Sequence, residues 1–201
     1  MRFLNDKRVA FLMYLAAVGL MLIFPSWALA HDSVSHFEAS AAAGFTHPFS
    51  GLDHLFLMFA LGYLLNKYTK AHRWGMFAVF LVSMLVGAML AITSVWTTPV
   101  ENGILLSVLV VAGLHGFRNN LSLQIVYALM MVTGVVHGIA HGLELPKESM
   151  ALSYVAGFLI ASSVILLAGL FLSLKVSTMH GRAWFGRAIG LALLSCFAFA
   201  V

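Results

Sequence analysis

The sequence predicts an all-α membrane protein in which a cleaved N-terminal signal peptide is followed by a bundle of six transmembrane helices. Of the 201 residues, 62% are hydrophobic and only 9% are charged, whereas soluble domains carry about 25% charged residues. The mean hydropathy is +0.99, and the apolar residues form blocks long enough to cross a bilayer as helices. The chain also begins with a basic stretch before its first apolar block, as secretory signals do.

The polar residues are few and unusual in kind. Nine histidines outnumber the seven Asp and Glu residues. A largely hydrophobic chain has little structural reason to contain so many imidazole side chains. Eleven Lys and Arg residues lie singly between apolar blocks, so they form no face for nucleic acid. The single cysteine, Cys196, excludes an internal disulfide and a CxxC metal site. The placement of the histidines is therefore the main clue to function.

The first thirty residues predict a secretory signal peptide. A basic stretch and an apolar stretch are followed by a small-x-small cleavage pattern that ends at Ala30. Removal of residues 1–30 would leave His31 as a periplasmic N-terminus and residues 31–201 as one transmembrane domain in a bacterial inner membrane. An uncleaved signal anchor is the alternative, and it leaves residue 31 on the same side.

Six further apolar segments are each long enough to span the bilayer, and the short loops between them suit a compact helical bundle. With residue 31 in the periplasm, the loop lysines and arginines fall almost entirely on the cytoplasmic side, as the positive-inside rule requires. The mature acidic residues fall at the periplasmic side, where they would concentrate cations. The predicted spans are residues 50–66, 74–96, 100–117, 121–143, 150–174 and 183–201.

The strongest motif lies at the C-terminal end of the fourth of these segments. His137, His141 and Glu144 stand at positions i, i+4 and i+7, which places them on one narrow arc of a helix. Two imidazoles one turn apart with a carboxylate form a common metal-binding arrangement. A capping role does not explain Glu144, because an acid at a helix C-terminus opposes the helix dipole. Glycines recur every fourth residue from 134 to 142, so a neighbouring helix is expected to pack closely beside this face.

A second motif lies around the start of the first mature segment, where His47, Asp53 and His54 are close in sequence. Ser50-x-x-Asp53 also matches a capping box, which would explain the acid by helix initiation alone. That alternative leaves the two histidines unexplained. A third motif, Thr98-Pro99-Val100-Glu101, is a capping pattern in which Glu101 is more readily a cap than a ligand.

The other histidines carry weaker signals. His115, at the cytoplasmic end of the third segment, either lines a path or faces the membrane interface. His72 and His180 lie in basic cytoplasmic loops, where solvated side chains are expected. His31 and His36 are candidates for capturing a metal near the mature N-terminus, with an ordinary N-terminal tail as the alternative. Mixed imidazole and carboxylate ligands suit Ni(II), Co(II) or Zn(II) better than Cu(I), and the eleven methionines are expected to pack or to face lipid.

At these motifs the chain resembles the HupE/UreJ family, whose members are hydrogenase- and urease-accessory membrane proteins regarded as nickel, sometimes cobalt, permeases. The resemblance extends over nearly the whole chain. The segments that carry it are His47-Pro48-x-x-Gly51-x-Asp53-His54, Pro99-x-Glu101-x-x-Ile104-x-x-Ser107 and His137-Gly138-x-Ala140-His141-Gly142-x-Glu144-x-Pro146.

The resemblance implies a secondary transporter that moves Ni(II) or Co(II) from periplasm to cytoplasm, with the metal as substrate, no organic cofactor and no enzymatic activity. It also implies an aromatic residue near the path, for which Phe80 is the counterpart. The ligand set implied is His47, Asp53, His54, Glu101, His141 and Glu144, with His137 beside them.

The energetics allow transport without ATP. The chain has no GxxxxGK[ST] phosphate loop, and the membrane potential alone favours inward movement of a divalent cation by about 4.6 kcal/mol per 100 mV. The alternatives are a b-type haem carrier, with His54 and His141 as axial ligands, and an assembly scaffold for a metalloenzyme. The sequence leaves open the choice between Ni(II) and Co(II), the energy coupling, a homo-oligomeric state and the metallochaperone that would receive the metal.

Overall fold

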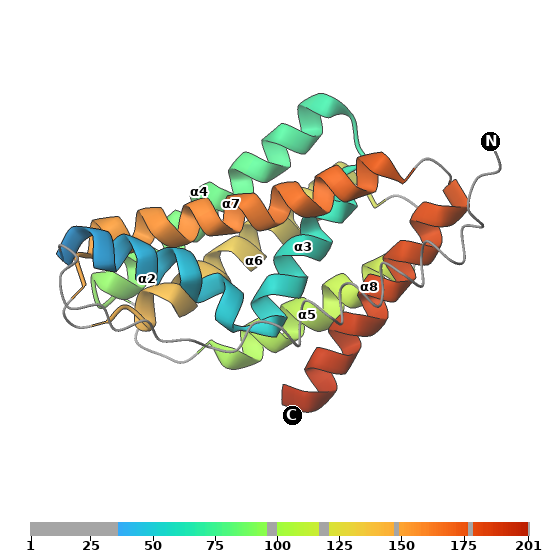
Figure 1. Cartoon of the computed structure of the whole chain (residues 1–201). Coiled ribbons are helices and arrows are strands. Elements are labelled where there is room, and N and C mark those ends of the chain that lie inside the picture. Colours follow the sequence, from blue (N-terminus) through green and yellow to red (C-terminus); the bar gives the residue numbers. More distant parts are fainter. Residues whose placement is uncertain (1–35, 96–99, 117–120, 147–148, 177–178, 201) are drawn as a thin grey trace.

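The computed structural model describes residues 36–95, 100–116, 121–146, 149–176 and 179–200, and within these ranges all regular secondary structure is helical (Figure 1). The predicted signal peptide and His31 lie outside the described residues. The helices are α2 (His36–Ser50), α3 (Leu52–Leu65), α4 (Lys70–Ile92), α5 (Glu101–Gly116), α6 (Leu123–Leu143), α7 (Ala151–Lys175) and α8 (Met179–Ala200).

The helices confirm an all-α chain with membrane-spanning character. Among the described residues, α4, α6 and α7 are each long and apolar enough to cross a bilayer, and α2 with α3 passes the same test as one bent pair. α5 and α8 contain shorter apolar stretches, Glu101–His115 and Trp184–Ser195. These criteria therefore support three to four spans, and the count of six stays a prediction.

The predicted start of the first span, residues 50–66, is wrong. Residues 36–50 form the additional helix α2, and Pro48 lies inside that helix instead of starting the next one. Pro48 has no N–H to offer the carbonyl of Gly44, so the helix is weakened there and ends two residues later. The chain then turns through Gly51, whose backbone is extended, and α3 leaves at 82° to α2.

The capping-box alternative for Ser50 and Asp53 is also wrong. Gly51 is the N-cap of α3 and forms no side-chain cap bond, while the Ser50 hydroxyl donates backwards to the carbonyl oxygen of His47 at 2.6 Å. Asp53 lies in the first turn of α3, where its charge suits the helix dipole. Its carboxylate is therefore available for a contact other than a cap.

The helices pack through glycines, as the repeat at residues 134–142 predicted. α6 packs mainly against α4, and a Cβ at Gly138 would overlap the backbone of Met84. The same arrangement joins the bent pair to α7, where Gly157 meets the backbone of α2 at Ala41 and Gly169 meets α3 at Phe59. Figure 1 shows α2 running alongside α7, with α5 and α8 as a separate pair that also contacts α3.

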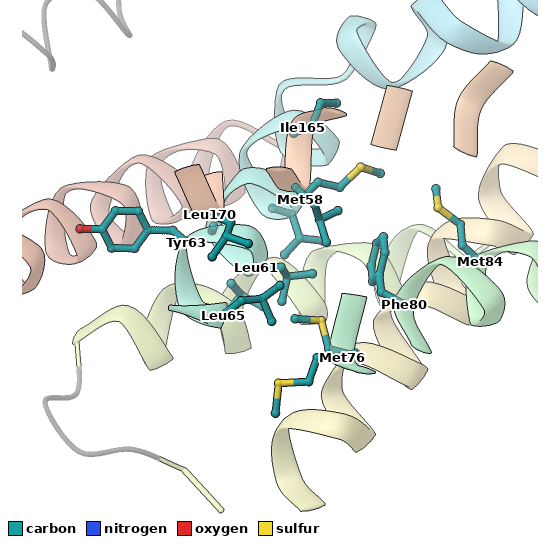
Figure 2. Close-up of a cluster of buried hydrophobic side chains, with 14 of the residues drawn as sticks. Met58, Leu61, Tyr63, Leu65, Met76, Phe80, Met84, Ile165 and Leu170 are labelled. Atoms are coloured by element: carbon teal, nitrogen blue, oxygen red, sulfur yellow. The ribbon is translucent and has the colours of Figure 1, made fainter. Parts of the chain in front are cut away.

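Methionine and aromatic side chains fill the centre of the bundle. Figure 2 shows Phe80 among Met58, Met76 and Met84, and none of these four side chains is exposed. Their sulfurs lie in an apolar cluster, which is the packing role expected for most methionines of this chain. This core holds α3, α4 and α6 together beneath the polar residues described next.

Candidate metal centre

The bend after α2 brings together histidines from three helices. The His47 ring lies 4.9 Å from that of His141, and the His54 ring lies 5.0 Å from His137 and 5.3 Å from His141, measured between ring centroids. His47 belongs to α2, His54 to α3, and the other two to α6. Two of the three sequence motifs therefore meet at one end of the bundle.

Three of the side chains form a group that we call the rim triad: His47, His141 and Glu144. One potential ligand atom from each lies within 4.8 Å of the others. His47 Nε2 donates to Glu144 Oε2 at 2.7 Å, and this hydrogen bond lowers the pKa of the Glu144 carboxyl below its usual value. Glu144 is consequently ionised at neutral pH, which is the form that binds a cation.

Asp53 and His54 form the other half of the first motif. His54 Nδ1 donates to Asp53 Oδ1 at 3.0 Å, and a Cβ at Gly51 would lie only 2.9 Å from that same oxygen. Glycine at the bend therefore leaves room for the pair. A carboxylate that accepts from one ring nitrogen fixes the tautomer and leaves the other nitrogen, here Nε2, with a lone pair for a metal.

His137 and His141 are the most deeply buried members, and neither side chain is exposed. His137 Nδ1 donates to the carbonyl oxygen of Thr133 at 2.9 Å. His137 Nε2, both nitrogens of His141 and His54 Nε2 are buried without a hydrogen-bond partner among the described residues. An unpaired buried polar atom costs about 1–3 kcal/mol, so four such atoms within one histidine cluster indicate a site built for a cation.

Helix α7 contributes an aromatic wall that the sequence reasoning missed. The Phe158 ring stacks on His141 at 4.9 Å, and Tyr154 lies 6.0 Å from His47 and 5.8 Å from Phe158. Both side chains are buried. Their spacing of four residues was the one sequence signal that could have placed them together at the site. Two aromatic residues at that spacing are, however, just as typical of an ordinary hydrophobic core. The wall limits the space on one side of the rim triad.

An open pocket of about 250 Å³ gives access to the cluster. It has room for an ion that still carries several waters, since each water occupies about 30 Å³ in the liquid. Asp53, His54, His47 and Glu144 line it together with the backbone of the bend, so the described pocket presents two carboxylates and two imidazoles to the outside. The lining residues are His47, Ser50, Gly51, Asp53, His54 and Glu144.

Several predicted residues lie elsewhere. Glu101 is the first residue of α5, has an exposed side chain and does not line this pocket. Thr98 and Pro99 lie outside the described residues, so the capping alternative for Glu101 stays a prediction. Phe80 is buried in the core, where its carbonyl meets Gly134 of α6.

The remaining histidines form no part of the cluster. His115 is buried, and its Nε2 donates to the carbonyl oxygen of Ala60 at 2.9 Å, which ties α5 to α3. His72 is half-buried beside Tyr127 instead of freely solvated, with 3.4 Å between Nδ1 and the hydroxyl oxygen. His36 begins α2 and is therefore not part of a plain tail. The side chains of His36 and His180 lie outside the described part of the structure.

Comparison with known proteins identifies the family. The family described as HupE / UreJ protein matches residues 18–199. The chain belongs to the HupE/UreJ family. Protein HupE of Rhizobium leguminosarum bv. viciae is 33% identical over 162 residues, which cover 81% of this chain and 82% of that protein. No solved structure matches the chain.

Membership gives a coarse function. HupE/UreJ proteins are known as hydrogenase and urease accessory proteins, which implies a non-enzymatic role. Family membership and the apolar helices together indicate a membrane accessory protein.

Proposed function

We propose that the protein is a permease that carries Ni(II), or Co(II), from the periplasm to the cytoplasm and so supplies the maturation of a metalloenzyme such as a hydrogenase or urease. The observation that carries this proposal is the set of unpaired, buried imidazole nitrogens that meets two carboxylates beside an open pocket. Imidazole and carboxylate together favour Ni(II), Co(II) and Zn(II) over soft Cu(I) and hard Mg(II).

The first step is capture at the rim triad. A hydrated ion is attracted by Glu144 and Asp53, which both line the pocket, and it exchanges some waters for protein ligands. It takes the place of the hydrogen bond between His47 Nε2 and Glu144 Oε2, so that both atoms become available as ligands. The ion then moves inward along α6, driven by the membrane potential.

The geometry disfavours the haem alternative. The rings of His54 and His141 are only 5.3 Å apart, and His137 and His47 lie against them at 5.0 and 4.9 Å. A porphyrin plane would have to enter between rings that already pack against one another. The carboxylates of the pocket would also have no role toward a haem iron.

Uptake of radiolabelled nickel by cells tests the proposal, with cobalt and zinc as competitors. Asp53→Asn keeps the shape of the side chain but removes the charge that orients His54, so we expect uptake at low nickel concentration to fall at least tenfold. His72→Gln is the matched control, because His72 lies outside the cluster, and it should leave uptake unchanged. Normal uptake by Asp53→Asn at equal protein level would favour the scaffold alternative instead.

A further inference from the structure

Tyr154 of α7 places an unpaired hydroxyl beside the rim triad. The side chain is buried, and its hydroxyl oxygen has no hydrogen-bond partner among the described residues. Buried hydroxyls ordinarily have a partner, because their removal from water without one is costly. An unpaired hydroxyl next to a candidate metal site therefore indicates a group that finds its partner during metal binding.

Backbone and ring contacts fix the position of Tyr154. A Cβ at Gly44 of α2 would overlap the carbonyl group of Tyr154, so α2 and α7 touch directly at this residue. Gly44 lies three residues before His47, and the Tyr154 ring lies 6.0 Å from the His47 ring. The Tyr154 ring also packs edge-on against Phe158 at 5.8 Å. The tyrosine is thus held in contact with the rim triad.

Glu144 is a member of the rim triad whose bonding must change when an ion binds. Its Oε2 accepts a hydrogen bond from His47 Nε2 at 2.7 Å, and the capture step replaces that bond. The carboxylate is close enough to the Tyr154 hydroxyl to interact with it electrostatically, and an ionised carboxylate is a strong acceptor for a hydroxyl hydrogen. Carboxylates that bind metals are usually oriented by a hydrogen bond from a second group.

We propose that Tyr154 is a positioning residue for metal capture, and that its hydroxyl donates to the Glu144 carboxylate when an ion takes the place of the His47 hydrogen bond. The carboxylate then keeps one hydrogen bond while it binds the ion. This inference rests on the proposed transport function and adds a residue to its capture step. Tyr154 does not line the open pocket, which fits a group that acts through Glu144 and does not bind the ion itself.

The variant Tyr154→Phe tests the hydroxyl, because it removes one oxygen atom and keeps the ring. Nickel binding is measured by calorimetry on the purified full chain in detergent, and the Tm is measured without nickel. We expect the nickel dissociation constant to rise about tenfold, as it does when a metal ligand loses its outer hydrogen-bond partner. The Tm without nickel should stay the same or increase, because the lost hydroxyl leaves no partner unpaired.

Tyr68→Phe is the matched control. The Tyr68 hydroxyl donates to the carbonyl oxygen of Leu121 at 3.2 Å, at the opposite end of α6 from the cluster. Its loss should therefore lower the Tm and leave the nickel dissociation constant within about twofold of wild type. A second comparison uses the Glu144→Ala background, in which adding Tyr154→Phe should weaken nickel binding by less than about twofold, since the group on which the hydroxyl acts is gone.

The inference is overturned by normal nickel binding in Tyr154→Phe, by weakened binding that accompanies a lower Tm, or by a loss of binding that persists undiminished in the Glu144→Ala background. A wild type that neither binds nickel nor takes it up would instead overturn the proposed function. Gel filtration checks folding. Tyr154→Met, which also lacks a hydroxyl and packs adaptably, replaces Tyr154→Phe if the latter does not fold, with the same expected dependence on Glu144.

Discussion

The contact between α4 and α6 lies beside the histidine cluster, and at Gly138 the two helices approach each other very closely. A Cβ added there would overlap the carbonyl oxygen, carbonyl carbon and Cα of Met84. These are backbone atoms that cannot rotate away, so Gly138→Ala must push the helices apart. Overpacking of this kind costs about 1–3 kcal/mol. For a chain of this size that corresponds to a loss of roughly 2–12 °C in Tm.

The chain provides a matched control at Gly113 in α5, where an added Cβ meets no atom within 4 Å. Gly113→Ala should stabilise the protein by up to about 1 kcal/mol, because alanine favours helix over glycine. Thermal unfolding of the purified protein in detergent compares the two variants. A Tm of Gly138→Ala equal to or above that of Gly113→Ala would refute the close-packed interface. Since Gly138 lies between His137 and His141, we also expect Gly138→Ala to reduce nickel uptake more than its loss of folded protein explains.

Three further predictions concern the cluster. Glu144→Gln should raise the nickel concentration for half-maximal uptake about tenfold, because a pocket-lining member of the rim triad loses its charge; an unchanged value would exclude Glu144 from capture. Glu144, whose pKa is lowered by its hydrogen bond with His47, stays ionised between about pH 7.5 and about pH 5.5, so Glu144→Gln should weaken uptake by the same factor at both pH values; a loss that vanishes at the lower pH would contradict an ionised Glu144. The visible spectrum of the purified protein should contain no Soret band, and such a band would restore the haem alternative.

The arc formed by His137, His141 and Glu144 was predictable because it depends on a single helix. Positions i, i+4 and i+7 face one way on any α-helix, so His137, His141 and Glu144 could be placed together without tertiary information. The glycine repeat beside them was predictable for the same reason. Their partner helix, α4, was not, since small residues permit a close approach without specifying what approaches.

The bend between α2 and α3 was not predictable, and the cluster depends on it. Pro48 and Ser50 both match helix-start signals, and a capping box is a local pattern that says nothing of a competing contact. In the structure, Ser50 donates backwards and Asp53 holds His54. Close glycine contacts with α7 hold both α2 and α3 in place on either side of the bend, and such contacts are tertiary information. The burial of Tyr154 and Phe158 against the histidines has the same origin.

Transport by the purified chain alone tests the central claim most directly. Wild type and His141→Gln are reconstituted into proteoliposomes with an inside-negative potential, and accumulation of radiolabelled nickel is followed over time. His141 belongs to the rim triad, and its ring also lies 5.3 Å from that of His54, so its loss should reduce accumulation to that of protein-free vesicles while wild type accumulates nickel. Wild-type vesicles that accumulate no nickel, or equal accumulation by both proteins, would contradict the account.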